Sequence, residues 1–400
     1  MPSKPSRLVA VLLLAAFVTF FDRSLLPPIF GPVSESLQVD REAVGTALTA
    51  YMFAYGIAQL GWGVLLAWWG RTRVLVIALL GCLIGAFMST VAGEYWLFMT
   101  GRVIAGTCFG ALIPIALVYF GDTLNMHDRG RANANIAAAL SLGLAVATIA
   151  SPVIARYWTW QVGFGLVVAF VIAVLIGVLR DRGQATVQPV SVADSLRRVM
   201  RNSWAWLVLG LMLLEGAILV GVVSYLPAAL EAYGTDPATA GLAVGVFGFA
   251  VIAWSFLVKR LIPIVPAYGL LGLGGTAAVV AYLVLTVVIT VPSVVVAAVL
   301  LGFAWAAAHT QLQTWMTDTV HDARAVGMSL LGVLMFVGAS IGSAVSNVAA
   351  TAHVWPPLFL GSMVVAVLFT VAAAIGRRYY PQHAANIAPD EAVGAASDGR

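Results

Sequence analysis

Long, unbroken apolar stretches recur along the whole chain and constrain its fold more than any other feature. Each is roughly 20 residues long, enough for a helix rising about 1.5 Å per residue to cross a hydrocarbon layer about 30 Å thick. Of the 400 residues, 61% are hydrophobic and 10% are charged, against roughly a quarter charged in an ordinary soluble domain. Because the runs do not alternate as barrel strands do, we predict an all-α membrane protein.

Hydropathy predicts about twelve transmembrane helices. The predicted spans cover residues 8–28, 43–68, 74–92, 97–121, 132–155, 160–179, 204–226, 238–258, 268–290, 293–315, 326–350 and 357–376. The first run leads into Asp22, Arg23 and two prolines rather than into a small-residue cleavage site. We therefore expect it to be a membrane helix and not a removable signal peptide.

The distribution of basic residues predicts the orientation of the spans. Of the 21 Lys and Arg, only Arg23 and Arg102 lie inside spans, and only Arg41 and Arg156 lie in odd-numbered loops. All the others lie in the termini and the even-numbered loops, which is the pattern of cytoplasmic segments. We expect a multi-pass protein of the cell (inner) membrane with both termini in the cytoplasm.

Two segments of the chain match each other at one common offset. Asp40, Gly45 and Phe53 align with Asp236, Gly241 and Phe249, and the same shift aligns Asp122-Thr123 with Asp318-Thr319. The match indicates two six-helix pseudo-repeats, an arrangement that transporters use with a binding site between the halves. The predicted division is an N-terminal six-helix bundle over 1–180, a cytoplasmic linker over 181–203 with a short amphipathic helix, a C-terminal bundle over 204–378 and a disordered cytoplasmic tail over 379–400.

Several short motifs resemble those of the major facilitator superfamily, and the likeness extends from Leu8 to Gly376. The loop that runs from Gly63 to Gly70, Arg71 and Arg73 is similar to the signature of that family after span two. Arg102 with Gly106 resembles its RxxxG element in span four, where the arginine is associated with proton coupling. Gly106 and Gly110 lie below Arg102 on one helix face, at i+4 and i+8, and let a neighbouring helix approach closely. The resemblance implies the twelve-helix major facilitator fold and a secondary transporter.

Two further sequence motifs indicate the direction of transport. Small residues around Ser151-Pro152 resemble the antiporter motif of span five, and Tyr225-Leu226-Pro227 with Gly241 and Thr314-Trp315 looks most like the proton-linked drug and sugar efflux (arabinose-efflux-like) branch. We therefore expect proton-coupled efflux of a small organic solute by antiport. Proton-coupled uptake of a small organic acid or sugar is the alternative.

The resemblance places spans one, four, seven and ten along the central cavity, and these spans hold the polar intrusions. Glu215 is flanked by apolar residues at helical spacing, and a charge at mid-bilayer costs roughly 2.5–3.5 kcal/mol. It is the first candidate for a proton-coupling carboxylate; the alternatives are a snorkelling glutamate or a pair with Arg102 across the halves. Asp22, Arg102 and His309 are the further coupling candidates. The alternative for Asp22 and Arg23 is a solvated position near the outer helix end.

Other polar and aromatic side chains are expected to line the substrate cavity. Trp305, His309 and Gln313 recur every four residues, as do Tyr51, Tyr55 and Gln59, so each set shares one helix face. Helix packing is the alternative for both sets. The predicted cavity residues are Arg23, Tyr51, Tyr55, Gln59, Tyr225, Trp305, Gln311 and Gln313.

Charged residues recur at equivalent cytoplasmic positions of both halves. We expect them to form gate salt bridges that are present in one transport state and absent in the other. The alternative is that they only set the topology. The predicted gate residues are Gly63, Gly70, Arg71, Arg73, Asp122, Arg129, Arg131, Asp318, Asp322 and Arg324.

Other function classes find little support in the sequence. The histidines are dispersed without HExxH spacing, Cys82 and Cys108 lie in apolar runs, and there is no GxxxxGK[ST] element. We therefore expect no metal, no cofactor and no enzymatic activity, a membrane-embedded enzyme being the remote alternative. The net charge of +4 is scattered rather than gathered in a stripe, so nucleic acid is not an expected partner. The expected partners are the lipid bilayer, a small organic solute and protons, for a monomeric carrier.

Overall fold

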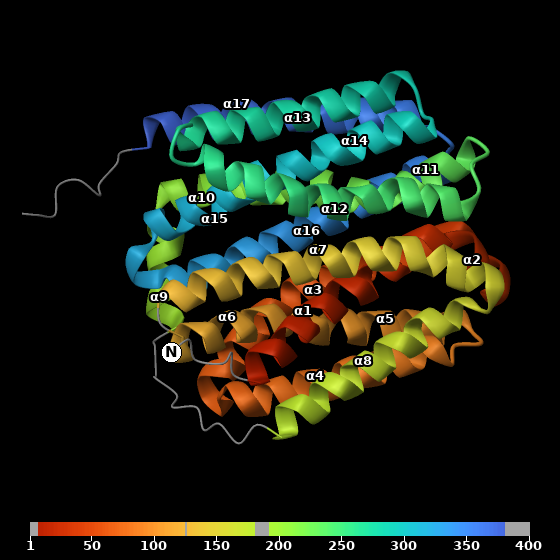
Figure 1. Cartoon of the computed structure of the whole chain (residues 1–400), viewed down its shortest axis with the longest axis horizontal. Coiled ribbons are helices and arrows are strands. Elements are labelled where there is room, and N and C mark those ends of the chain that lie inside the picture. Colours follow the sequence, from red (N-terminus) through yellow and green to blue (C-terminus); the bar gives the residue numbers. More distant parts are fainter. Residues whose placement is uncertain (1–6, 125, 181–191, 381–400) are drawn as a thin grey trace, which may run out of the picture.

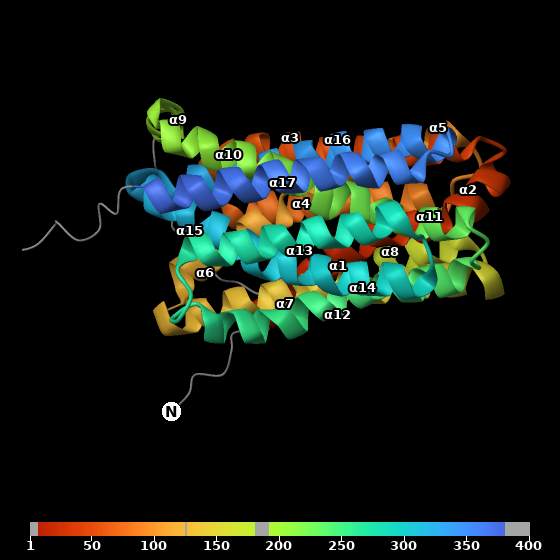
Figure 2. The same cartoon turned by 90° about the horizontal axis from the view of Figure 1, so that it is seen from above.

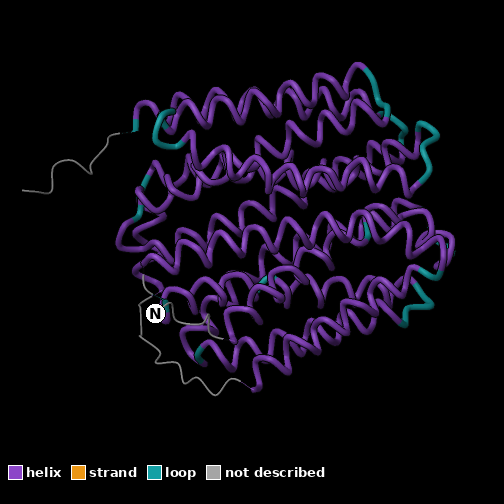
Figure 3. The backbone as a smooth tube through the Cα atoms, in the orientation of Figure 1, coloured by secondary structure: helices purple, strands orange, loops and turns teal. Residues whose placement is uncertain are grey.

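The computed structural model describes residues 7–124, 126–180 and 192–380, and within these ranges the chain is helical without any strand (Figure 3). Twelve of the helices are long and apolar enough to cross a membrane. This confirms the predicted all-α fold, and it identifies a multi-pass membrane protein. The predicted disordered tail begins too early, because Tyr379 still belongs to the last helix; its residues from 381 on and the first part of the predicted linker lie outside the described residues.

Several of the twelve spans are built from more than one helical segment. The first six consist of α1 (Arg7–Leu25), η1 (Pro27–Ile29) and α2 (Phe30–Leu37); α3 (Arg41–Trp69); α4 (Arg71–Thr90); α5 (Tyr95–Phe109) and α6 (Leu112–Thr123); α7 (Met126–Tyr157); and α8 (Trp160–Arg180). The last six consist of α10 (Ser203–Gly216), η2 (Ala217–Val222), η3 (Val223–Tyr225) and α11 (Leu226–Ala232); α12 (Pro237–Leu261); α13 (Ala267–Val287); α14 (Val291–Ala304), η4 (Trp305–His309) and α15 (Thr310–Thr319); α16 (Arg324–Thr351); and α17 (Trp355–Tyr379).

Spans one and seven extend further than hydropathy predicts. The first runs to Leu37 and the seventh to Ala232, beyond the predicted ends at residues 28 and 226. Prolines explain the difference, since Pro27 and Pro28 form a 3₁₀ turn and Pro227 lies in the first turn of α11. Proline is well tolerated in a first helical turn, so the chain continues as a new helix where a stop is expected.

The two halves of the sequence lie side by side, with their helices along the same direction (Figures 1 and 2). The first half, in red to yellow-green, packs through α1 against α7 and α8, and through α3 and α4 against α5. The second half, in green to blue, packs through α12 and α13 against α14, and through α10 and α13 against α16 and α17 respectively. This arrangement is the twelve-helix fold of two six-helix pseudo-repeats.

One end of the bundle carries the start of α1 and the ends of α8 and α17, and is called the terminal side below; the opposite end, with α2 and α11, is the distal side (Figure 1). On the terminal side, α9 (Val192–Arg201) contacts α16 and the 3₁₀ turn η5 (His321–Ala323). The short helix predicted in the linker is therefore confirmed. Its buried Ser195 and Val199 lie four residues apart, with exposed arginines between and beyond them, as an amphipathic helix requires.

The halves meet along two helix pairs, α3 with α16 and α7 with α12. Small residues allow the close approach: a Cβ added to Gly248 of α12 would lie 2.7 Å from the Ser141 carbonyl of α7. On the other pair, a Cβ on Gly45 of α3 would lie 2.6 Å from the Tyr225 hydroxyl and would also collide with the Asn347 amide oxygen. The contact at Gly45 lies near the start of α3, toward the distal side, and the contact at Gly248 lies near the middle of α12.

Candidate functional site

A fully buried ion pair joins span one to span four. Arg102 Nη1 donates to Asp22 Oδ1 at 3.0 Å and Nη2 donates to Oδ2 at 2.7 Å, and the two side chains are 1% and 0% exposed. The Arg102 guanidinium also lies 4.5 Å from the Tyr51 ring centroid and 5.0 Å from that of Phe164. Two groups predicted as coupling candidates therefore form one bidentate pair inside the first half.

The glycine stripe predicted below Arg102 explains how this pair is positioned. Added Cβ atoms would lie 2.5 Å from the Tyr51 carbonyl at Gly106 and 2.6 Å from the Tyr55 carbonyl at Gly110. Only glycine permits α5 to approach the backbone of α3 this closely. The approach brings Arg102 over the Tyr51 ring and into reach of Asp22.

Two of the alternatives considered for these residues are wrong. Asp22 and Arg23 are not solvated near a helix end, because they are 0% and 5% exposed. Arg102 does not pair with Glu215 across the halves, because its partner is Asp22. Adjacent residues project about 100° apart on a helix, which lets Asp22 face α5 while Arg23 points elsewhere.

Arg23 lies among aromatic rings. Its guanidinium is 4.0 Å from the centroid of Phe20 in its own helix and 5.7 Å from that of Phe336 in α16. Tyr51 and Tyr55 are close enough to interact with it electrostatically. Because Phe336 belongs to the second half, Arg23 reaches the boundary between the halves near mid-span.

The second half contains its own buried titratable pair. Glu215 Oε2 lies 2.9 Å from His309 Nδ1, with Glu215 0% exposed and His309 15% exposed. His309 Nε2 lies 3.1 Å from Gln313 Nε2, and its ring stacks on Trp305 with centroids 4.4 Å apart. The predicted face of Trp305, His309 and Gln313 is therefore confirmed, and it continues into Glu215 on the neighbouring span.

Both members of this pair adjoin a π-helical segment. Glu215 precedes η2 by two residues, and His309 is the last residue of η4. The Tyr282 hydroxyl donates to the Ile218 carbonyl within η2, which satisfies one of the displaced backbone groups. π-Helical turns occur frequently at functional sites, since the extra residue re-aims the neighbouring side chains. Apolar periodicity gives no signal for them.

The remaining predicted cavity residues are buried as well. Tyr51, Tyr55 and Gln59 of α3 are 0%, 2% and 6% exposed, and Gln311 of α15 is 8% exposed. The ring centroids of Tyr55 and Phe336 lie 4.0 Å apart across the boundary between the halves. Gln59 packs against Gly332 of α16, where an added Cβ would collide with the Gln59 amide oxygen. Tyr55 and Gln59 therefore face the second half of the chain, whereas the Tyr51 ring lies under the Arg102 guanidinium of the first half.

A polar seam on the distal side was not predicted from the sequence. The Thr49 and Ser343 hydroxyls are 2.8 Å apart, and Asn347 Nδ2 donates to the Glu42 carbonyl at 2.9 Å. Tyr225, predicted to line the cavity, lies beside this seam with its ring against Phe30. Farther out, Arg41 Nη1 and Glu231 Oε2 form an ion pair at 3.3 Å. Short polar residues in helices carry no distinctive pattern, which explains why the seam was missed.

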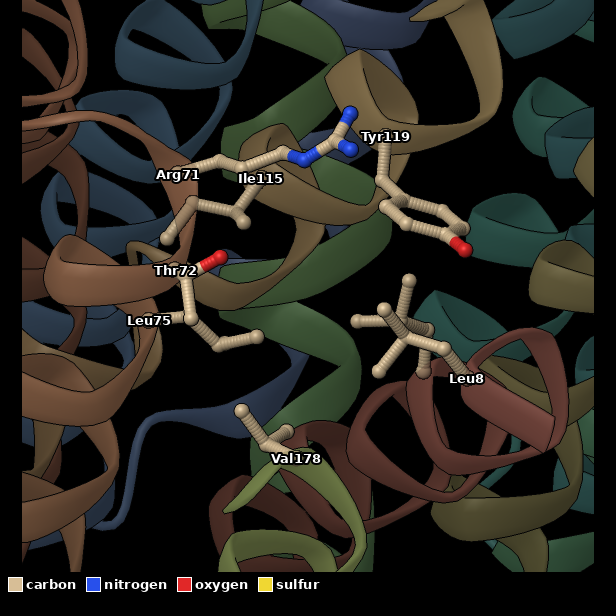
Figure 4. A pocket seen from close by; sticks show the side chains of 8 residues that line it. Leu8, Arg71, Thr72, Leu75, Ile115, Tyr119 and Val178 are labelled. Atoms are coloured by element: carbon tan, nitrogen blue, oxygen red, sulfur yellow. The ribbon is translucent and has the colours of Figure 1, made fainter. Parts of the chain in front are cut away.

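Several predicted gate residues lie on the terminal side within the first half. Arg71 turns toward Tyr119 of α6, with its guanidinium 4.7 Å from the ring centroid, beside a cavity of about 20 Å³ lined by α1, α4, α6 and α8 (Figure 4). That volume holds about one water molecule and no solute. Gly70 forms the whole link between α3 and α4 with φ +77°, which requires glycine. Gly63 has open space around it, and Arg73 and Arg131 are exposed.

The gate predicted in the second half stays a prediction, and one of its residues has a partner within that half. Asp318 pairs with Arg377 of α17, Nη2 to Oδ2 at 2.8 Å, and both belong to the same half. This bond does not link the halves, so it does not have to break when they separate. Arg324 is exposed at the start of α16. The side chains of Asp122, Arg129 and Asp322 lie outside the described residues.

No group of three His, Cys, Asp or Glu side chains that could hold a metal ion occurs in the described parts of the chain. The two cysteines there, Cys82 and Cys108, are free and buried. The described polar chemistry of the interior therefore rests on the Asp22–Arg102 ion pair in the first half, the hydrogen-bonded Glu215–His309 pair in the second half, and Arg23.

Comparison with known proteins identifies related sequences and folds. A probable L-galactonate transporter of Escherichia coli K12 is 29% identical over 136 residues, covering 34% of this chain and 30% of that protein. A chloramphenicol efflux pump of Mycobacterium tuberculosis is 24% identical over 195 residues, covering 49% of this chain and 46% of the pump. The matched segments thus span less than half of the length of these curated relatives.

Solved structures share the fold over almost the full chain. The crystal structure of a D-xylose-proton symporter superposes with a TM-score of 0.77 at 14% identity, covering 94% of this chain and 98% of the symporter. The sequence profile of the Major Facilitator Superfamily matches residues 12–326. The twelve spans, the two packed halves and this match establish that the chain belongs to the Major Facilitator Superfamily.

Proposed function

We propose that this chain is a proton-coupled secondary transporter that moves a small organic solute across the membrane by alternating access. It acts as a carrier rather than an enzyme, as a monomer of the cell inner membrane with both termini in the cytoplasm. The membership of its family supports carrier function. The proposal depends most on one observation, the buried pair of Glu215 and His309.

The pair is suited to binding a proton inside the membrane. Glu215 is fully buried and Oε1 has no hydrogen-bond partner among the described residues, so His309 supplies the only described donor to this carboxyl group. An ionised carboxylate in such a place costs several kcal/mol unless it is neutralised by a proton or a cation. The imidazole of His309 has two ring nitrogens and can also carry a proton. A proton reaching either group therefore changes the charge balance between the two spans.

The location of the pair couples this proton to movement of the halves. Glu215 lies in α10, which packs against α16, and α16 forms the main contact with α3 of the first half. A change of charge at Glu215 alters the packing of a helix that contacts the mobile boundary. Coupling requires only that the halves have two arrangements in which the Glu215–His309 pair binds a proton with different affinity.

Export by antiport is the first candidate for the direction. The chloramphenicol efflux pump aligns over 195 residues, which favours an exporter, as do the small residues around Pro152 in α7 and the likeness to the drug and sugar efflux branch. Uptake by symport of an organic acid is the second candidate. It is favoured by a specific observation, the absence of a carboxylate partner for Arg23 among the described residues.

Proton movement in proteoliposomes tests the proposal. The purified chain is reconstituted with a pH-sensitive dye in the lumen, and chloramphenicol, galactonate or a lipophilic cation is added outside. We expect one solute to move protons: the lumen becomes acidic for symport and alkaline for antiport. Glu215→Gln should abolish this proton movement while exchange of labelled solute for unlabelled solute continues, because the neutral amide resembles the protonated acid.

The matched control is Glu35→Gln, which makes the same change on an exposed residue of α2. It should leave proton movement unchanged. Full solute-driven proton movement in Glu215→Gln would remove this glutamate from the coupling mechanism. Solute movement without proton movement in the wild type would show a uniporter.

A further inference from the structure

Arg23 is a buried cation without a carboxylate. Its side chain is 5% exposed, Nη1 is buried, and neither a hydrogen bond nor an ion pair joins it to any residue that the structure describes. Its closest described contacts are the Phe20 and Phe336 rings. Ring faces attract a cation by about 0.5–2 kcal/mol each, which is less than the cost of burying an unpaired charge.

The carboxylates of the protein interior are engaged elsewhere. Asp22 is adjacent in sequence, but both of its oxygens accept from Arg102. Glu215 Oε2 bonds to His309 in the second half, and Glu231 pairs with Arg41 toward the distal side. An arginine cannot shed its charge by losing a proton inside a protein. The missing negative charge near Arg23 therefore has to come from outside the chain.

A buried hydroxyl without a described hydrogen-bond partner lies on α3, beside the Tyr55 ring that packs against Phe336. The Tyr51 hydroxyl is buried without a hydrogen-bond partner in the described parts of the chain, and Tyr51 interacts electrostatically with Arg23. The Arg102 guanidinium lies 4.5 Å from the Tyr51 ring centroid and holds this ring in place. A guanidinium and a hydroxyl together offer several donors, as the two oxygens of a carboxylate require.

The rings around these donors indicate the rest of the ligand. Phe20, Tyr55 and Phe336 surround Arg23, and the Tyr55 and Phe336 rings are 4.0 Å apart across the boundary between the halves. Aromatic walls favour a flat, partly apolar body. A ligand held here contacts both halves, as a transported solute must in an alternating-access carrier.

We propose that Arg23 and the Tyr51 hydroxyl bind the carboxylate of the transported solute, and that the solute is a small organic monoanion with a flat apolar body. This inference rests on the proposed function and names its substrate class. It holds for either direction of transport. Arg102 acts as a positioning residue, since its guanidinium packs on the Tyr51 ring. It also occupies both carboxylate oxygens of Asp22, which therefore does not neutralise Arg23.

Ligand-induced thermal shifts of the full-length purified chain test this inference at a single pH without any gradient. Benzoate, cinnamate and gluconate are compared at equal ionic strength with benzamide, cinnamamide and glucose, their uncharged counterparts. Unfolding is followed by tryptophan fluorescence. We expect at least one carboxylate to raise the Tm by about 5 °C at saturation, and its uncharged counterpart to have little effect.

Three variants locate the site. Arg23→Gln should abolish the carboxylate shift, and Arg23→Lys should retain a smaller one, because lysine keeps the charge but loses the planar fork. Tyr51→Phe removes only the hydroxyl and should weaken carboxylate binding about tenfold. If Arg23→Gln does not fold, the last two variants still decide. Arg260→Gln, the same change on an exposed residue near the end of α12, is the control and should behave as wild type.

Several results would overturn the inference. The first is that no carboxylate stabilises the wild type more than its uncharged counterpart does. The second is a Tm shift that stays undiminished in Arg23→Gln, or in both Arg23→Lys and Tyr51→Phe. The third is an equal Tm shift from chloride or phosphate, which would show an inorganic anion site. Glu215→Gln should keep the carboxylate shift. If the wild-type chain binds carboxylates but moves no protons, only the proposed function is contradicted. If it moves protons with its solute but binds no carboxylate, only this inference is contradicted.

Discussion

Arg102 and Asp22 form a two-point ion pair in which each terminal guanidinium nitrogen donates to a different carboxylate oxygen, at 3.0 and 2.7 Å. The pair joins α1 to α5 inside one half of the molecule, so it can persist while the halves move relative to each other. The Arg102 Nε is buried without a described partner, so the Asp22 carboxylate is the main compensation for the charge of this arginine. The pair is therefore a structural unit of the first half, and it separates Asp22 from Arg23.

The energetic role of this pair can be measured with a double-mutant cycle. Asp22→Asn leaves Arg102 buried without its counter-ion and should cost about 3–5 kcal/mol of stability. Arg102→Gln should cost a similar amount, whereas the double variant should cost clearly less than the sum. Chemical denaturation in detergent micelles measures the three changes. Additive costs would mean that the two groups do not stabilise each other, and Arg73→Gln on the exposed terminal side serves as the unaffected control.

The close approach at Gly45 predicts a variant that favours opening on the distal side. Valine at this position would collide with Asn347 and with the Tyr225 hydroxyl, where α3 meets α16. Gly45→Val should therefore lengthen the distance between spin labels on the exposed residues 35 and 233 of the two halves, as measured by electron paramagnetic resonance.

Gly61→Val is the matched control for this experiment. Gly61 lies in the same helix, but an added Cβ there would have no neighbour within 4 Å. Both substitutions place a β-branched residue in α3, so any shared effect on helix propensity cancels. Identical distance distributions in the two variants would show that the seam at Gly45 does not hold the distal side closed.

Features that repeat along one helix could be predicted from the sequence. All twelve spans are present near their predicted positions, since burial in lipid demands apolar length whatever the tertiary packing. The face of Trp305, His309 and Gln313 and the stripe of Gly106 and Gly110 below Arg102 are also confirmed, because i to i+4 spacing places side chains together before any partner helix is known.

Pairings between helices could not be predicted in the same way. Nothing in the sequence indicates that Asp22 selects Arg102 or that Glu215 selects His309, because each choice depends on how far two spans are shifted along each other. The π-helical segments η2 and η4 re-aim the residues around Glu215 and His309 by adding a residue to a turn, without a marker in composition. Thr49 and Ser343 likewise gain meaning only when α3 lies on α16.

The pairing of Asp318 with Arg377 predicts a small, local effect. Asp318 is 40% exposed and Arg377 is 16% exposed, so solvent screens the bond and its loss in Asp318→Asn should cost at most about 1 kcal/mol. Spin labels on the exposed residues 73 and 324 report the separation of the halves on the terminal side. Their distance distribution should match that of wild type in Asp318→Asn; a shift would support the hypothesis that this aspartate is part of a gate.

The N-terminus of α12 should show a pH-dependent contribution to stability. The side chain of Thr239 hydrogen-bonds to Asp236 and lowers the pKa of this carboxyl group, and the backbone N–H groups of Thr239 and Ala238 add to the effect, each 3.1 Å from Oδ1. Because the pKa is lower in the folded than in the unfolded chain, the stabilisation is fully present above the unfolded value of about 3.9. It is lost as the pH falls through the folded value.

Asp236→Ala should therefore lower the Tm at pH 7, and the difference from wild type should shrink below about pH 4. Asp236→Asn keeps an oxygen that accepts the same bonds, so its Tm should lack this pH dependence. The internal repeat supplies a matched control, since Asp40 occupies the equivalent position before α3 but its side chain makes no capping hydrogen bond. Asp40→Ala should leave the Tm nearly unchanged, and an equal loss at both positions would show that the charge at the helix end matters rather than the cap.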